Sequence, residues 1–280
     1  MLIKDTIRKG MIILKTNNIE EPNLKARLLM QFILNKSRQY LLVHDDEELT
    51  RIQEKAYLEG IEKISKGVPL QHITHSQEFM KMNFYVNEDV LIPRPDTEIL
   101  VEEVINISNK ANKVKILDMC TGSGIIAISL AKYIKNSEIT AVDISPKALR
   151  IAKLNAKNNN VEEKITFIES DLFNNIVKEK YDIIVSNPPY IKNEVIKSLD
   201  KEVQKEPYIA LAGGEDGLEF YRKIINQGFE YLKFNGYLCL EIGYDQKKEV
   251  IDIINSEEKY SETYAKKDLA GNDRIIIAKI

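Results

Sequence analysis

Apolar residues in the first 75 positions recur at the spacing of a helix face. A second apolar run follows Pro22, and a third extends from Leu49 to Ile64. Intervals of three and four residues are typical of amphipathic helices, and the first run shows them at Ile3, Ile7, Met11 and Leu14. These runs contain no cluster of reactive side chains. We therefore predict a helical domain over residues 1–75 that serves in substrate docking.

The apolar pattern changes from helical spacing to alternation between Glu78 and Ile92. The segment EFMKMNFYVNEDVLIP alternates apolar and polar residues, which is typical of half-buried strands. Asn87-Glu88-Asp89 is the candidate turn between the two strands. We predict a β-hairpin linker over residues 76–92, followed by a second domain over residues 93–280.

Short apolar runs alternate with helical stretches in this second domain. Such alternation predicts a doubly wound parallel sheet with helices on both faces. Only Leu269-Ala270-Gly271 separates the last two runs, which is too short for a crossover helix, so they must pair antiparallel. The expected fold class is α/β, a Rossmann-like seven-stranded sheet with its last strand antiparallel. The seven runs span residues 113–119, 138–144, 164–171, 181–187, 236–243, 260–268 and 272–280.

Composition narrows the class of protein. The 280 residues carry a formal net charge of −3, with 12 Lys and Arg against 10 Asp and Glu up to residue 75, and a net −5 over the remainder. A protein that binds a phosphate backbone is expected to be basic, so no direct nucleic-acid partner is expected. Cys120, Cys239 and the three histidines form no metal-ligand spacing. We expect no metal, no membrane span or leader peptide, and a cytoplasmic monomer.

Three strand ends carry residues suited to an adenosine-type ligand, because open α/β sheets bind ligands beyond the carboxyl ends of their strands. Asp118 to Gly124 (DMCTGSG) form a glycine-containing turn before an apolar helix, although packing turns of this kind are common. Asp143 can bond both ribose hydroxyls, or Asp143 or Ser145 can cap the next helix. Asp171 can meet the adenine amino edge, or cap its own loop.

The fourth strand ends in Asn187-Pro188-Pro189-Tyr190, which separates a methyl-transfer site from a nicotinamide dehydrogenase. The Asn187 side-chain oxygen and the Pro188 carbonyl can each accept a hydrogen from a planar –NH2 group. The prolines fix the backbone and remove competing N–H donors, and Tyr190 can stack on the flat group. The alternative is a proline-rich turn with no chemistry.

These motifs resemble the S-adenosylmethionine-dependent amino-methyltransferases, and more narrowly the release factor glutamine N5-methyltransferases. The narrower resemblance is carried by residues 69–102, which contain IPRPDTE, and by VSNPPYI (185–191), EPYIALAGGEDGLEFYRKI (206–224) and AGNDRIIIAK (270–279). It implies methylation of the side-chain amide of the glutamine in the Gly-Gly-Gln loop of class I peptide chain release factors. S-adenosyl-L-methionine would be the cofactor and S-adenosyl-L-homocysteine its product.

The resemblance also implies roles for individual residues. It places Cys120 near the methionine part of the cofactor, at a position where relatives often have glycine, and Leu172 in apolar contact with the adenine. Arg94 and Glu98 would shape the mouth of the pocket, or would order the hairpin. The implied cofactor residues are Asp118, Cys120, Thr121, Gly122, Ser123, Gly124, Asp143, Asp171, Leu172 and Asn187. The implied substrate residues are Arg94, Glu98, Asn187, Pro188, Pro189 and Tyr190, of which Asn187, Pro188 and Tyr190 are catalytic.

Two other functions remain open at this point. A nucleic-acid methyltransferase acting on adenine N6 or guanine N2 uses the same grip on an exocyclic amine. A non-catalytic module could keep the cofactor and only dock on a translation factor. A basic groove would favour the first, and absence of turnover with labelled cofactor would favour the second.

Overall fold

The computed structural model describes residues 1–109 and 113–280 and divides into two compact units. The first contains Met1–His75 together with Leu199–Lys205, and the second contains Ser76–Ser198 and Glu206–Ile280. The inclusion of Leu199–Lys205 in the first unit was not predicted, since this segment lies far along the chain from the other residues of that unit.

The first unit is helical, as predicted. Its apolar core includes Ile3, Ile7 and Leu14, the residues whose spacing indicated the first helix. The fourth helix begins with a capping box between Thr50 and Gln53, which satisfies backbone donors that a helix start leaves free. Its helices are α1 (Ile3–Thr16), α2 (Pro22–Leu34), α3 (Arg38–Val43), α4 (Arg51–Ser65) and α5 (Leu70–Thr74), with a 3-10 turn at Val203–Lys205.

The hairpin forms, but its turn lies seven residues before the predicted one. Strands β1 (Gln77–Phe79) and β2 (Met82–Phe84) pair antiparallel around Met80 and Lys81, whose φ angles are 49° and 58°. A two-residue hairpin turn needs such positive angles, and Met and Lys do not signal them in sequence. Asn87–Asp89 forms a separate turn, in which the Asp89 N–H donates to Asn87 Oδ1 at 3.0 Å.

The second unit contains the seven-stranded sheet, and the fold prediction is confirmed. The strand order is β5-β4-β3-β6-β7-β9-β8, with β9 antiparallel to both of its neighbours. The short connection between β8 and β9 dictates this reversal. The strands are β3 (Val114–Met119), β4 (Ser137–Asp143), β5 (Ile165–Glu169), β6 (Tyr181–Ser186), β7 (Leu232–Glu241), β8 (Glu262–Lys267) and β9 (Asp273–Lys279).

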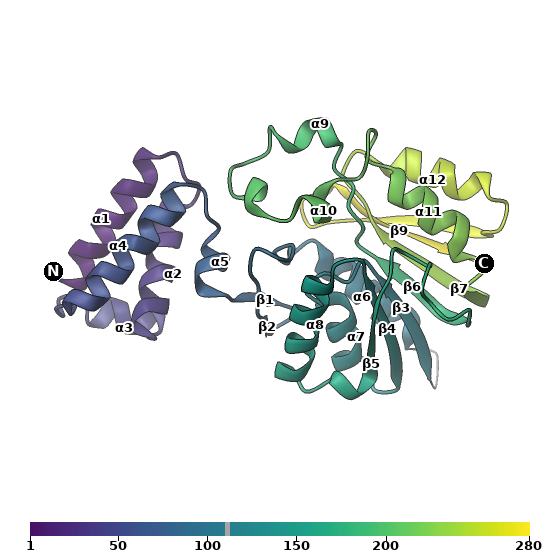
Figure 1. Ribbon diagram of the computed structural model, residues 1–280, viewed down its shortest axis with the longest axis horizontal. Coiled ribbons are helices and arrows are strands. Elements are labelled where there is room, and N and C mark those ends of the chain that lie inside the picture. The colour runs from purple at the N-terminus through teal and green to yellow at the C-terminus, as the bar shows by residue number, and fades with distance from the viewer. Residues whose placement is uncertain (110–112) are drawn as a thin grey trace. The chain divides into compact units, whose positions relative to one another are not determined.

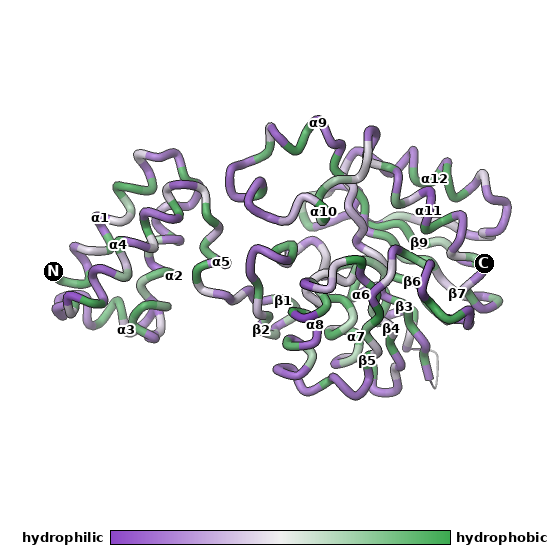
Figure 2. Tube along the Cα trace, in the orientation of Figure 1, coloured by the Kyte–Doolittle hydropathy of each residue, from purple (hydrophilic) through white to green (hydrophobic). Residues whose placement is uncertain are grey.

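Helices cover both faces of this sheet (Figure 1). Two apolar clusters result, one beneath α6, α7 and α8 and one beneath α11 and α12. Much of the sheet is hydrophobic, whereas the outer helices alternate (Figure 2). In the described part of the chain no helix is long and apolar enough to cross a bilayer. The helices are α6 (Thr97–Ser108), α7 (Ile125–Tyr133), α8 (Pro146–Asn158), α9 (Asn193–Ile196), α10 (Tyr208–Leu211), α11 (Glu219–Gly228) and α12 (Lys247–Ser256), with a 3-10 turn at Glu162–Lys164.

Candidate active site

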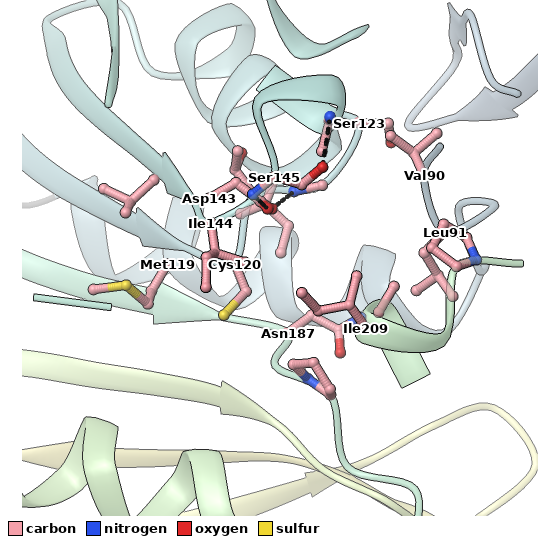
Figure 3. A pocket seen from close by; sticks show the side chains of 18 of the residues that line it. Val90, Leu91, Met119, Cys120, Ser123, Asp143, Ile144, Ser145, Asn187 and Ile209 are labelled. Atoms are coloured by element: carbon pink, nitrogen blue, oxygen red, sulfur yellow. Dashed lines mark hydrogen bonds between the residues drawn. The ribbon is translucent and has the colours of Figure 1, made fainter. Parts of the chain in front are cut away.

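The carboxyl ends of β3, β4, β5 and β6 surround one cavity of about 300 Å³. Met119 and Cys120 lie on one side of it, Val90 and Leu91 on the other, and Asn187 near Ile209 (Figure 3). Parallel strands present their carboxyl ends at one edge, which is why loops distant in sequence meet here. Ten of the predicted site residues line the cavity: Arg94, Cys120, Thr121, Gly122, Ser123, Asp143, Asp171, Leu172, Asn187 and Pro189.

The remaining five predicted site residues lie behind the cavity wall or beside it. Pro188 is buried, and Tyr190 packs against the cluster beneath α11 and α12. Glu98 accepts a hydrogen bond of 2.6 Å from the Met80 N–H, so its carboxylate contacts the hairpin turn, which was the structural alternative for this residue. Asp118 and Gly124 belong to the interior of the glycine turn.

Asp118 organises the glycine turn after β3 from within. Its Oδ2 accepts from Thr121 Oγ1 at 2.6 Å and from the Ala127 N–H at 3.1 Å, which ties the turn to the first residues of α7. Complete burial raises the pKa of this carboxyl to about 7, against the opposing effect of those two donors. Asp118 therefore shapes the cavity wall without lining it.

The three left-handed residues of this turn differ in their surroundings. Cys120 has a φ of 62°, although it carries a side chain, and burial raises the pKa of its thiol. A Cβ at Gly122 would have no atom within 4 Å, so this backbone is open to a ligand. A Cβ at Gly124 would lie 2.9 Å from Ile128 Cδ1 and 3.0 Å from Ala152 Cβ, so here glycine allows two helices to pack closely.

Asp143 joins the ends of β3 and β4. Its Oδ2 accepts from the Gly122 N–H at 2.8 Å and its Oδ1 from the Ser145 N–H at 2.9 Å. Burial raises the pKa of Asp143, while these backbone donors lower it. The cap of α8 is Ser145, whose Oγ accepts from the Ala148 N–H at 3.2 Å. Asp143 is thus not needed as a helix cap, and its carboxylate lines the cavity.

Two residues after β5 complete the wall on the side of that strand. Leu172 is buried and has a φ of 47°, and Asp171 beside it is exposed. Both line the cavity, so an apolar surface and a carboxylate lie next to each other there.

Asn187 lies at the cavity wall directly after β6, and its side chain is held by Thr97 of α6, which also lines the cavity. Its Nδ2 donates to Thr97 Oγ1 at 3.3 Å. The two prolines that follow offer no N–H, and the chain after them is braced by residues 211–214, where the Gly213 N–H donates to the Ile191 carbonyl at 2.8 Å. A Cβ at Gly213 would lie 2.7 Å from Tyr190 Cα, so this contact requires glycine.

Several residues in or beside the cavity were not predicted individually from the sequence. Ile209, Phe220 and Lys223 line the cavity. Glu206, which is buried, bonds to the Arg94 guanidinium and accepts from the Ile92 N–H at 2.8 Å. These residues lie in the segment 206–224 that carried part of the family resemblance, which was the available signal. The contacts of Glu206 with Ile92 and Arg94, more than 100 positions earlier, have no local pattern.

The fold and this site define the class of protein, a methyltransferase. A family model described as Methyltransferase small domain matches residues 95–207, and one described as PrmC N-terminal domain matches residues 5–74. A crystal structure of a methyltransferase from Pyrococcus furiosus shares the fold, with a TM-score of 0.53 and 19% identity, covering 72% of this chain and 90% of that one.

Curated relatives identify the family. The release factor glutamine methyltransferase of Clostridium acetobutylicum is 41% identical over 281 residues, which cover 99% of this chain and 98% of the relative. The protein of the same name from Moorella thermoacetica is 36% identical over 278 residues, with the same shares covered. The chain belongs to the release factor glutamine methyltransferase family, which confirms the resemblance inferred from its motifs.

Proposed function

We propose that this protein transfers a methyl group from S-adenosylmethionine to the side-chain amide nitrogen of the glutamine in the Gly-Gly-Gln loop of peptide chain release factors. The observation that carries the proposal is that Asn187 lines the same cavity as Asp143 and the glycine turn. An acceptor suited to a planar –NH2 group and residues suited to an adenosine-type ligand therefore line one cavity. The names of the full-length relatives point to the same substrate.

The residues present fit S-adenosylmethionine. The Gly122 backbone is open to the cavity, the Asp143 carboxylate suits two ribose hydroxyls, and Leu172 offers an apolar surface to the adenine. Asp171 lies beside Leu172, where it can meet the adenine amino edge. When bound, this cofactor supplies an electrophilic methyl group.

The protein's task in the reaction is to position the substrate amide. The lone pair of an amide nitrogen is delocalised, so the nitrogen must be held in line with the methyl group. Asn187 Oδ1 and the Pro188 carbonyl accept its two hydrogens, and Pro189 stiffens the loop. Tyr190, which packs against the cluster beneath α11 and α12, supports this loop from beside the cavity. The nitrogen loses one proton to water as or after it gains the methyl group. Arg94, which is paired with Glu206, lines the cavity and orders the segment around the substrate.

A protein substrate fits the charge of the chain better than a nucleic acid does. Residues 76–280 carry 28 Lys and Arg against 33 Asp and Glu, which opposes binding to a phosphate backbone. We infer that the helical unit docks the release factor. In support, Leu24, Leu28 and Phe32 follow one another at four-residue intervals along α2, and their side chains are 48%, 39% and 47% exposed.

Labelled S-adenosylmethionine tests the proposal directly. The protein is incubated with each purified release factor, with the same factor carrying alanine in place of the loop glutamine, and with DNA and RNA. Label is expected on the loop glutamine alone, mapped by mass spectrometry of the peptides. Label on nucleic acid, or undiminished label on the alanine factor, would refute the proposed substrate.

A further inference from the structure

Asn187 has a buried carboxylate for a neighbour, and the sheet register places it there. β6 and β7 run parallel, and Ser186 is paired with Leu240. The next residues on the two strands, Asn187 and Glu241, are therefore adjacent at the carboxyl edge of the sheet. Glu241 is 1% exposed, and the side chains of Thr97 and Asn187, which are joined by a hydrogen bond of 3.3 Å, both lower the pKa of its carboxyl group.

Burial of the Glu241 carboxylate is unfavourable for folding, so the stability of the protein does not explain why this residue is present. Among the described residues its Oε2 has no hydrogen-bond partner. The nearby cation, Arg274 of β9, is engaged by Asp96 at 3.1 Å and by Asp268 at 2.9 Å. A buried carboxylate without full pairing lowers stability relative to a neutral side chain of similar size.

The chemistry of the Asn187 amide supplies a reason for this carboxylate. An amide turned by 180° about its last torsion has almost the same shape but exchanges its donor and acceptor ends. The Thr97 hydroxyl can donate or accept, so it cannot select between the two orientations. An ionised carboxylate only accepts, so Glu241 selects the orientation in which Nδ2 faces the interior and Oδ1 is left for the substrate.

We propose that Glu241 and Thr97 are positioning residues, which hold the Asn187 side chain with Oδ1 available to the substrate amide in the cavity. In the reverse orientation, Nδ2 would point its hydrogens at those of the substrate –NH2 group and would repel it. The proposal rests on the proposed function for its substrate, while the orientation of Asn187 is a property of the protein alone.

The proposal implies a dependence on pH. Burial raises the pKa of Glu241 to about 7, against the lowering effects of Thr97, Arg274 and Asn187, and with a further raising effect from Asp96. Tyr190 and Tyr221 of α11 also face this carboxylate, and their own pKa values are raised, so they are neutral in this range. A protonated Glu241 can donate to Asn187 Oδ1 and no longer selects the productive orientation. The rate should therefore fall as the pH drops through about 7.

Glu241→Gln removes the acceptor-only character with little change of shape. We expect its single-turnover rate on a release factor to fall at least tenfold and to lose the acid limb near pH 7. Affinity for S-adenosylhomocysteine and KM for the release factor should equal the wild-type values. Thermal stability should equal or exceed that of the wild type. The matched control is Glu103→Gln, because Glu103 is also a buried carboxylate but bonds to Tyr264 and Lys266 outside the cavity. It should keep both the rate and the acid limb.

Thr97 provides a second, independent pair of variants. Thr97→Val keeps the volume and removes the hydroxyl, so the rate should fall, whereas Thr97→Ser keeps the hydroxyl and should restore most of it. Wild-type rates and an unchanged pH profile in both Glu241→Gln and Thr97→Val would overturn the proposal.

An NMR measurement separates this inference from the proposed function. The Asn187 side-chain N–H resonances, assigned by their loss in Asn187→Ala, should titrate near pH 7 in the wild type without substrate and should move in Glu241→Gln. If the wild type methylates no release factor but these shifts occur, the proposed substrate is wrong and the positioning role stands. If the chemical shifts of these resonances changed neither with pH nor in Glu241→Gln, the positioning role would be overturned, whatever the substrate.

Discussion

The carboxylate of Asp143 accepts a hydrogen bond of 2.8 Å from the Gly122 N–H. The end of β4 and the turn after β3 therefore form one continuous wall of the cavity. Residues separated by 21 positions in the chain act together there, and the carboxylate keeps its remaining acceptor positions for a ligand.

Asp143→Ala should weaken binding of S-adenosylhomocysteine at least tenfold, because each charge-assisted bond to a ribose hydroxyl contributes about 1.5–3 kcal/mol. Isothermal titration calorimetry measures this affinity. Asp182→Ala is the matched control, since this aspartate lies near the start of β6, where it pairs with Lys233. Asp182→Ala should lower the thermal stability slightly and leave the affinity for S-adenosylhomocysteine unchanged. Equal affinity of Asp143→Ala and the wild type would leave Asp143 with a structural role only.

Gly122→Ala and Gly124→Ala should have opposite profiles although they are two residues apart. Alanine at Gly124, where φ is 84°, would overlap Ile128 and Ala152, so the free energy of unfolding should fall by about 1–3 kcal/mol. Alanine at Gly122 meets no protein atom, so it should cost only about 1 kcal/mol of backbone strain but obstruct the cofactor. Thermal melts and cofactor titrations of both variants distinguish these effects. If one of the two variants were the more impaired in both stability and cofactor affinity, the two glycines would not have separate roles.

Asn187→Ala should reduce methyl transfer on the order of 10²-fold or more, the usual scale for removing one preorganised polar contact at a reacting group. Cofactor affinity should largely remain, because β3, β4 and β5 supply most of that wall. Asn187→Asp keeps an acceptor but adds charge, so we expect partial activity. Single-turnover rates on a release factor measure both. A wild-type rate in Asn187→Ala would show that the Asn-Pro-Pro-Tyr segment is a turn without a catalytic role.

Asp118 should make the protein less stable as the pH rises from about 4 to about 7. Its folded-state pKa of about 7 exceeds the ordinary value of 3.8, so in this window the folded state holds a proton that the unfolded state has released. Asp118→Asn removes this effect. Its free energy of unfolding relative to that of the wild type should therefore increase by on the order of a few kcal/mol from pH 5 to pH 8.

Chemical denaturation at the two pH values measures the difference. Asp216→Asn is the control, because pairing with Arg222 lowers the pKa of that exposed carboxyl to about 2, outside the window. Parallel pH dependence of the wild type and Asp118→Asn would show that Asp118 is already ionised at pH 5.

Replacing Leu28 and Phe32 of α2 by glutamate should raise KM for an intact release factor by tenfold or more. Charges on this exposed stripe would oppose its burial against a partner. KM for a short Gly-Gly-Gln peptide and cofactor affinity should not change. Phe234→Glu is the control, since Phe234 is 86% exposed at the surface of the second unit. Unchanged KM for the intact factor would refute docking through α2.

The sequence by itself determined the sheet and ten of the residues that line the cavity. The strands contain short apolar runs, and a three-residue connection forces the last strand to turn back. The residues that follow those strands were identifiable because parallel strands bring their carboxyl ends together whatever the details of packing. Asp143 and Asn187 were located in this way, before any contact was known.

Only the tertiary structure decided what stands behind those residues. Thr97 and Glu241 reach Asn187 from 90 positions before it and 54 after it, through the register of β6 with β7 and the start of α6. The hairpin turn at Met80, the Arg94–Glu206 pair and the grouping of Leu199–Lys205 with the helical unit likewise depend on such contacts. Local patterns report which face of an element is buried, but they do not report which distant side chain meets it, because that is decided by packing of the whole chain.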